Sequence, residues 1–261
     1  MSAAGARFVS AAAWRGGSLL VAAGVVVLWQ QIANFRLVSP VFLPGPDRAW
    51  GALMRGFTEG DLAAKLVGTL EHMLFGWLAA SFAGIALGAL IGSSPRARAY
   101  LTPTLEFLRP LPVSALIPVA IALFGLSQAM ALTVIGFGAL WPMLLATVHG
   151  FASVEPRLYE VARTLHMSRV AVIFKVALPS ASPDILAGMR LSVTVALILS
   201  VVCEMLAGLD GLGNWVLLSA RMFRSADLFA GVILLGVIGY VTALVVAMVE
   251  RRLLAWRPDH G

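Results

Sequence analysis

Long apolar runs recur along this sequence and limit what the chain can fold into. A helix needs about 18–20 apolar residues to cross the roughly 30 Å hydrocarbon layer of a membrane. About six such helices are expected by run length and breaker residues, over residues 17–34, 65–92, 110–125, 128–150, 183–208 and 228–253. Only 12% of the residues are charged, about half the share of a soluble domain. We therefore expect an all-α integral membrane protein and, because no long linker divides it, one transmembrane domain over residues 1–261.

The basic residues lie mainly between the apolar runs and predict the orientation of the chain. Lys and Arg are retained on the cytoplasmic side of the membrane. The two ends of the chain and the segments around Arg96 and Arg163 are basic, so both termini of this multi-pass chain are expected in the cytoplasm of a bacterium. A nucleic-acid surface would gather its basic residues with aromatic ones. No nucleic-acid partner is therefore expected, despite the net charge of +6.

The chain has one cysteine and no catalytic motif. Cys203 lies inside an apolar run, which excludes an internal disulfide and a multi-cysteine metal site. The phosphate-binding Gly-four-residues-Gly-Lys-Ser/Thr loop, the His-Glu-two-residues-His zinc motif and the Gly-Xaa-Ser-Xaa-Gly elbow are absent from the sequence. The chain is therefore not expected to be an enzyme.

Arg7 and Arg15 precede an apolar stretch as in a signal peptide, but the small residues lie before that stretch, so a retained first span is expected.

The loop over residues 153–179 carries the most specific pattern. Ser153, Glu155 and Pro156 suit the start of one helix, and Ser168 can cap a second. The second helix is expected to stop near Leu178 because Pro179 follows, and Ser182–Pro183 to restart a helix that becomes the fifth span. An apolar stripe of Leu158, Val161 and Leu165 favours docking onto a soluble partner. An amphipathic hairpin lying on anionic lipid is the alternative.

This loop resembles the EAA motif of permease subunits from ATP-binding cassette importers. Glu160-Val161-Ala162, three residues, His166, and then Val176-Ala177-Leu178-Pro179 reproduce the spacing of that motif. The resemblance implies that the loop couples the permease to an ATPase subunit, through Glu160, Ala162, Leu165, His166, Met167, Ser168, Leu178 and Pro179. His166 stands where the motif has glycine, and a left-handed backbone is expected there because histidine is among the residues that tolerate a positive φ.

The resemblance extends over most of the chain. Pro40–Pro46, Arg109–Pro118, Glu204-Met205-Leu206 and Gly211-Leu212-Gly213 are similar to segments of the nitrate, sulfonate, taurine and bicarbonate importer group. Membership implies a type I importer permease that encloses a path for a small anionic solute. It also implies a second permease copy in a homodimer, two ATPase subunits that bind ATP and Mg, and an external solute-binding protein.

Ionisable residues near the apolar runs are candidates for the translocation path, because such groups are costly in a membrane. These candidates are His72, Arg109 and Glu204. Structural alternatives are a pair between Glu106 and Arg109 and a helix–helix hydrogen bond from Glu204. If these groups relayed protons, the chain could instead be a secondary transporter driven by an ion gradient.

Gly84, Gly88 and Gly92 recur every four residues in the second run. This spacing places them on one helical face, and it predicts a seam where two helices pack closely.

Overall fold

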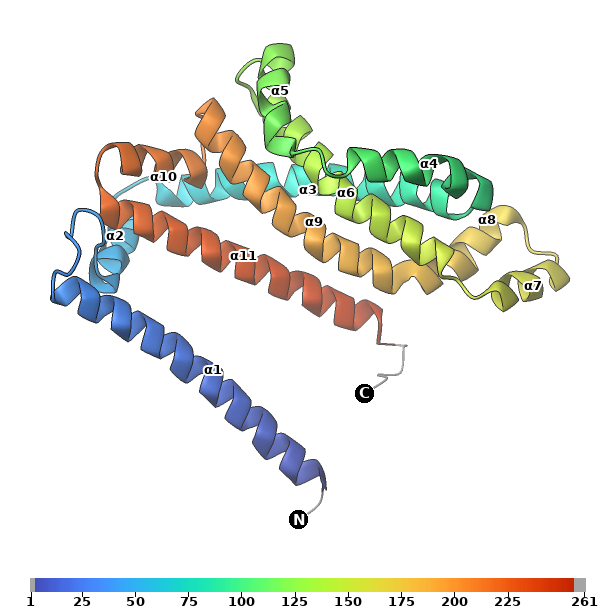
Figure 1. Cartoon of the computed structure of the whole chain (residues 1–261), viewed down its shortest axis with the longest axis horizontal. Helices are drawn as coiled ribbons and strands as arrows, with labels where there is room; N and C mark the ends of the chain where they lie inside the picture. Colours follow the sequence, from blue (N-terminus) through green and yellow to red (C-terminus); the bar gives the residue numbers. More distant parts are fainter. Residues whose placement is uncertain (1–2, 256–261) are drawn as a thin grey trace. The chain divides into compact units, whose positions relative to one another are not determined.

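The computed structural model describes residues 3–255, except for the side chains of residues 3–16 and 19, and within this range the regular elements are helices. The long helices are α1 (Ala3–Asn34), α3 (Leu62–Gly92), α6 (Gln128–Ala152), α9 (Leu178–Ala207) and α11 (Ser225–Leu253) (Figure 1). Between them lie α2 (Pro46–Thr58), α4 (Pro95–Leu108), α5 (Ile117–Phe124), α7 (Pro156–Thr164), α8 (Arg169–Val172) and α10 (Leu212–Arg221). A 3₁₀ turn at Val113–Leu116 precedes α5, and a π-helical turn at Ile173–Ala177 joins α8 to α9.

Four helices among the described residues are long and apolar enough to cross a membrane, over Leu62–Gly92, Gln128–Ala152, Arg169–Ala207 and Ser225–Leu253. A fifth candidate is the pair Pro95–Leu108 and Val113–Phe124, which bends by 79°. The expected span over residues 110–125 is therefore wrong as a separate crossing helix, because its helical part, Val113–Phe124, is the second half of this bent pair. Pro110 and Pro112 lie at the bend, where they lack the N–H groups that a continuous helix needs. The expected first span over 17–34 lies within α1, and its apolar part with described side chains is Leu20–Asn34.

The chain divides into two compact units. The first comprises residues 1–63 and 215–233, and the second comprises residues 64–214 and 234–261. In the first unit the indole N–H of Trp29 donates to the carbonyl of Pro44 at 3.0 Å, and its ring contacts Phe229 with centroids 5.5 Å apart. The Ser225 hydroxyl donates to the carbonyl of Val41. The second unit holds the hairpin between α6 and α9 and most of the long helices.

Helices α3 and α6 pack through glycines in the second unit. A Cβ on Gly84 would lie 2.8 Å from Met143, one on Gly88 would lie 2.5 Å from Thr147, and one on Gly92 would lie 2.6 Å from Phe151. The partner residue stands a constant number of positions later each time, so the two helices run parallel. The predicted glycine seam is confirmed, and α6 is the helix that it contacts.

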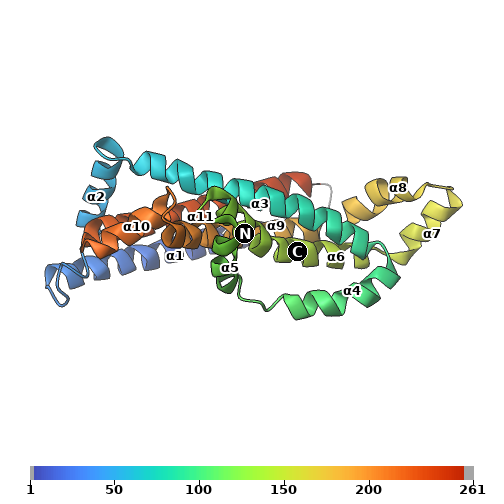
Figure 2. The ribbon, with the colours of Figure 1, turned by 90° about the horizontal axis from the view of Figure 1, so that it is seen from above.

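Helix α9 lies beside α6 and runs in the opposite direction, as Figures 1 and 2 both show. The hydroxyl of Ser192 is buried and donates to the carbonyl of Ala139 at 2.6 Å. Gly188 brings the backbones close, since a Cβ there would lie 3.1 Å from the carbonyl of Pro142. Together α3, α6 and α9 supply most of the buried apolar core of this unit.

The helix that follows the loop is continuous through both prolines, which corrects the expectation that it stops near Leu178 and restarts at Pro183. The N–H of Leu178 donates to the carbonyl of Ile173, five residues back, so the π turn widens the helix just before Pro179. Farther on, Pro183 removes a donor from the helix interior. The hydroxyl of Ser182 compensates by donating to the carbonyl of Pro179 at 2.8 Å. The span therefore runs unbroken over Arg169–Ala207.

Candidate functional site

Helices α7 and α8 form a short hairpin between α6 and α9, seen in Figure 2 at one end of the second unit. Neither side chain expected to cap α7 does so. Glu155 stands at the N-cap without a side-chain hydrogen bond, and the Ser153 hydroxyl donates back to the carbonyl of His149 at 2.8 Å. The expected cap of α8 is confirmed, because the Ser168 hydroxyl accepts from the N–H of Ala171 at 3.2 Å.

The turn between the two helices is a Schellman motif. His166 has φ of 50°, which confirms the left-handed backbone expected there. Its N–H donates to the carbonyl of Arg163 at 3.0 Å, and the N–H of Met167 donates to the carbonyl of Ala162, also at 3.0 Å. These two bonds satisfy carbonyls that the end of α7 would otherwise leave free. The turn is thus held by main-chain bonds, and the imidazole of His166 lies exposed on its outside.

Helix α7 presents two different faces. Leu158, Val161 and Leu165 are 40%, 54% and 67% exposed, so the stripe predicted from sequence is an open apolar surface. Ala162, on the same helix, is buried. The exposed Glu160 stands between Leu158 and Val161 in the sequence and lies about 100° around the helix from Val161, away from the stripe. An exposed apolar stripe on a projecting hairpin is a surface suited to a protein partner.

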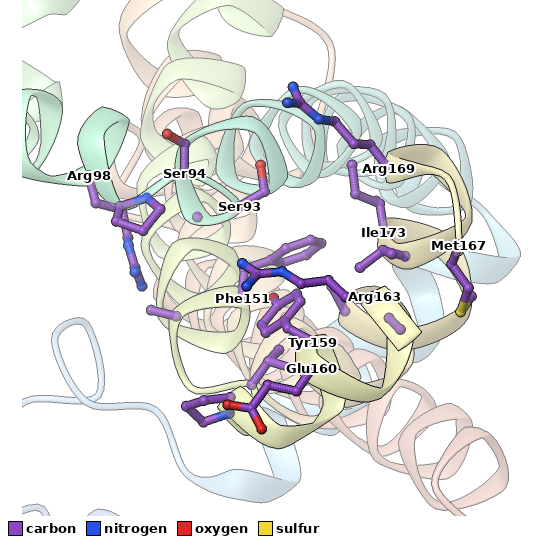
Figure 3. A pocket seen from close by; sticks show the side chains of 18 residues that line it. Ser93, Ser94, Arg98, Phe151, Tyr159, Glu160, Arg163, Met167, Arg169 and Ile173 are labelled. Carbon is purple, nitrogen blue, oxygen red and sulfur yellow. The ribbon is translucent and has the colours of Figure 1, made fainter. Parts of the chain in front are cut away.

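The other face of α7 borders a hollow of about 890 Å³ (Figure 3). Arg98 of α4, Arg163 of α7 and Arg169 of α8 line it, together with apolar side chains of α6 and the π turn. Tyr159 also lines it. Burial raises the pKa of the Tyr159 hydroxyl, against the opposing effect of the nearby Arg98, so this phenol remains protonated near neutral pH.

The remaining predicted coupling residues lie away from the tip of the hairpin. Leu178 and Pro179 form the first turn of α9, where Leu178 packs against the buried cluster around Met143 and Phe151. The hairpin therefore brings together Glu160, Ala162 and the segment from Leu165 to Ser168. One continuous helix connects it to Leu178 and Pro179.

A second polar group lies inside the bundle around Glu204, whose side chain is fully buried. Its carboxylate accepts from the Thr69 hydroxyl at 2.9 Å and from the N–H of Gly213 at 2.8 Å, and it lies 3.1 Å from Nδ1 of His72. The Thr69 oxygen in turn accepts from the N–H of Leu212 at 2.8 Å. One carboxylate thereby joins α3, α9 and the first turn of α10.

Glycines allow this cluster to close. A Cβ on Gly211 would lie 2.2 Å from the Glu204 carboxyl carbon, and one on Gly213 would lie 2.4 Å from the carbonyl of Val201. At the edge of the cluster Lys65 forms an ion pair with Asp210. In the sequence, Gly211 and Gly213 stood out only as part of a resemblance. Thr69 was missed, because a single threonine within an apolar helix does not indicate a buried hydrogen bond.

Of the three predicted path residues, the structure brings two together. His72 and Glu204 are in contact, whereas Arg109 is exposed at the C-terminal end of α4. Within the described residues no ion pair joins Arg109 to Glu106 or to the cluster. The same part of the chain contains no group of three His, Cys, Asp or Glu side chains that could hold a metal ion.

Comparison with known proteins gives consistent matches. The family described as "Binding-protein-dependent transport system inner membrane component" matches residues 80–255. The putative aliphatic sulfonates transport permease protein of Bacillus subtilis is 35% identical over 252 residues, covering 95% of this chain and 89% of that protein. The taurine transport system permease protein of Escherichia coli is 30% identical over 242 residues, covering 91% of this chain and 87% of that protein.

A solved structure shares the fold. The chain matches a structure of inward-facing conformations of the MetNI methionine ABC transporter with a TM-score of 0.65 and 16% sequence identity. The match covers 74% of this chain and 95% of the other. At this level of identity the likeness concerns the arrangement of the helices alone.

Proposed function

The chain belongs to the family of binding-protein-dependent transport system inner membrane components and is a permease subunit of an ATP-binding cassette importer, and we propose that it forms the path for a small anionic solute. It is a multi-pass inner membrane protein and not itself an enzyme, because ATP hydrolysis in such importers belongs to a separate subunit. The solute class follows from relatives named for aliphatic sulfonates and taurine, both of which carry a sulfonate group.

The hairpin of α7 and α8 is the proposed contact with the ATPase subunit. The observation that carries this proposal is the exposed stripe of Leu158, Val161 and Leu165. A partner that covered the stripe would remove apolar surface from water, worth roughly 25 cal/mol per Å² before the costs of association. The Schellman turn at His166 keeps the two helices of the hairpin in a defined geometry.

The continuous helix from α8 into α9 gives this contact a route into the membrane. A push on the hairpin would act on a rigid element over Arg169–Ala207, whose only irregular turn is the π turn over Ile173–Ala177. Such turns frequently occur at functional positions in helices. We place Leu178 and Pro179 in this connection and Glu160, Ala162, Leu165, His166, Met167 and Ser168 in the contact itself.

The complete importer in this proposal contains two copies of the permease in a homodimer, two ATPase subunits that hold ATP and Mg, and an external binding protein that delivers the solute. Both termini and the hairpin lie in the cytoplasm, as the basic residues indicate. Solute selection rests largely with the binding protein. The ion-gradient alternative lacks support, since the family is that of binding-protein-dependent systems.

The contacts of the three candidates for the translocation path distinguish a structural role from contact with solute. Glu204 and His72 satisfy each other and neighbouring groups inside the bundle, which favours the helix–helix hydrogen bond over direct contact with solute. Arg109 is exposed and has no acidic partner in the described part of the chain. We therefore retain Arg109 as the candidate for contact with an anionic solute.

Substitutions in the hairpin test the proposed contact. Leu165→Asp and Glu160→Lys should reduce co-purification of the ATPase subunit and uncouple ATP hydrolysis from uptake in reconstituted vesicles. The matched control is Leu126→Asp, at a residue of similar exposure (62%) that precedes α6 at the opposite end of that helix from the hairpin. Wild-type assembly and coupled uptake in both the Leu165 and the Glu160 variant would refute the contact.

A further inference from the structure

The hollow bordered by the hairpin holds positive charge without acidic partners. Arg98, Arg163 and Arg169 all line it, and no carboxylate of the described chain lies within salt-bridge distance of any of them. Figure 3 shows Arg163 reaching into the hollow, while Arg98 lies on the opposite side. The acidic residue that lines the hollow, Glu160, has its carboxylate turned away from the Arg163 guanidinium in the same view. The hollow therefore favours an anion.

The floor of the hollow is apolar. Phe151 and Ala177 are buried there, and Ile173 is half-buried beside them. A small hydrated anion gains nothing from such a surface, whereas an amphiphile can cover it with a hydrocarbon part. Ser94 and Tyr159 add hydroxyl groups to the lining, and these can donate hydrogen bonds to a phosphate oxygen.

The hollow also lies where apolar helices end. Gly92 closes α3 and Ala152 closes α6, and both helices are candidate spans. Residues at the ends of spans stand at the level of the lipid headgroups. Basic pockets between membrane helices on the cytoplasmic side are suited to anionic headgroups.

Use of the hollow is compatible with use of the stripe. Tyr159, Ala162 and Arg163 face the hollow, while Leu158, Val161 and Leu165 do not line it. Glu160, Ala162 and Met167 of the proposed contact line the hollow as well, whereas the stripe lies outside it, so a partner seated on the stripe leaves the arginines of the hollow accessible from the membrane side.

We propose that this hollow binds the phosphate group of an anionic amphiphile, with the phosphate between Arg98 and Arg163 and the apolar part against Phe151 and Ile173. A phospholipid of the cytoplasmic leaflet supplies this chemistry at this depth. The choice of leaflet rests on the proposed orientation of the importer, whereas the site itself rests on the charges and the apolar floor.

The test measures binding of phosphatidylglycerol to the purified full-length chain in detergent, by native mass spectrometry and by the shift in thermal unfolding. Phosphatidylcholine and inorganic phosphate are the comparison ligands. The double variant Arg98→Gln/Arg163→Gln should lower the affinity for phosphatidylglycerol about thirtyfold. The matched control is Arg96→Gln, which removes an exposed arginine of the same helix that does not line the hollow and should bind as the wild type does.

Equal affinities in the double variant and the Arg96→Gln control would overturn the site. Binding of inorganic phosphate as tight as that of phosphatidylglycerol would overturn the role of the apolar floor. If the double glutamine variant does not fold, two milder variants replace it. Arg98→Lys/Arg163→Lys keeps both positive charges and should bind phosphatidylglycerol more weakly than wild type. It should still bind more tightly than the single variant Arg98→Gln, which loses one charge. Because this assay contains no ATPase subunit, its failure is separate from failure of the proposed hairpin contact.

Discussion

His166 takes a backbone conformation that glycine reaches without steric cost, since its φ is 50°. Its imidazole is exposed, and the two hydrogen bonds of the turn come from the main chain. His166→Gly should therefore keep ATP hydrolysis coupled to uptake. His166→Val should impair both, because a β-branched residue strongly disfavours this φ, at a cost of about 1–3 kcal/mol. Uptake and hydrolysis in reconstituted vesicles measure the difference, and an inactive glycine variant would show that the side chain itself is needed.

Glu204 holds together three elements through one carboxylate. Glu204→Ala leaves the Thr69 hydroxyl and the N–H of Gly213 without their acceptor, and each unsatisfied buried group costs about 1–3 kcal/mol. Glu204→Gln retains one acceptor oxygen and should destabilise the chain less. Thermal unfolding in detergent should rank the variants wild type, Gln, Ala. Met205→Ala controls for truncation at the neighbouring position of the same helix, and equal melting points for all variants would exclude the structural role of Glu204.

At the scale of the helices, the glycine seam between α3 and α6 sets how closely they pack. Gly88→Ala would bring a Cβ to 2.5 Å from Thr147 and 2.9 Å from the carbonyl of Leu144, so the helices must separate. Overpacking of this kind costs about 1–3 kcal/mol. Gly236→Ala is the control, since a Cβ there meets nothing within 4 Å. Thermal unfolding should show a lower melting point for the Gly88 variant only. A Gly88 variant as stable as the control would mean that the two helices have room for the added Cβ and are not closely packed at this position.

The elements that sequence predicted well are those specified by neighbouring residues. Apolar run length located α3, α6 and α11, and the Ser168 cap and the His166 turn are local features. Helices α2, α4 and α10 were missed because they are short and mix polar with apolar residues.

The other misses have two different causes. Thr69 and Glu204 are separated by 135 positions, so no local pattern links them. In α9 the Ser182 hydroxyl donates to the carbonyl of Pro179, which lacks its usual helical donor because residue 183 is proline, and a π turn precedes Pro179. Local rules read those prolines as helix ends.

At the scale of the whole molecule, the orientation of the chain decides whether the hairpin can meet an ATPase at all. The basic residues predict a cytoplasmic hairpin, while the start of α6 stands at the opposite end of that helix. Single cysteines at exposed positions can report which side of the membrane a segment lies on. Ser219, in α10, is buried and would be a poor reporter. Leu126, just before α6, and Thr164, in the hairpin, are both exposed.

The labelling experiment uses a Cys203→Ala background, because Cys203 is the chain's own buried thiol. Leu126→Cys should react with an impermeant thiol reagent added to intact cells, and Thr164→Cys should react only after the membrane is permeabilised. Permeabilised cells supply the control for reactivity, since both thiols should then label. A charged hairpin does not cross an apolar layer spontaneously, because each buried charge costs several kcal/mol, so the pattern reports a fixed topology. Labelling of Thr164→Cys in intact cells would place the hairpin outside, where no ATP is available, and the coupling contact would then be excluded.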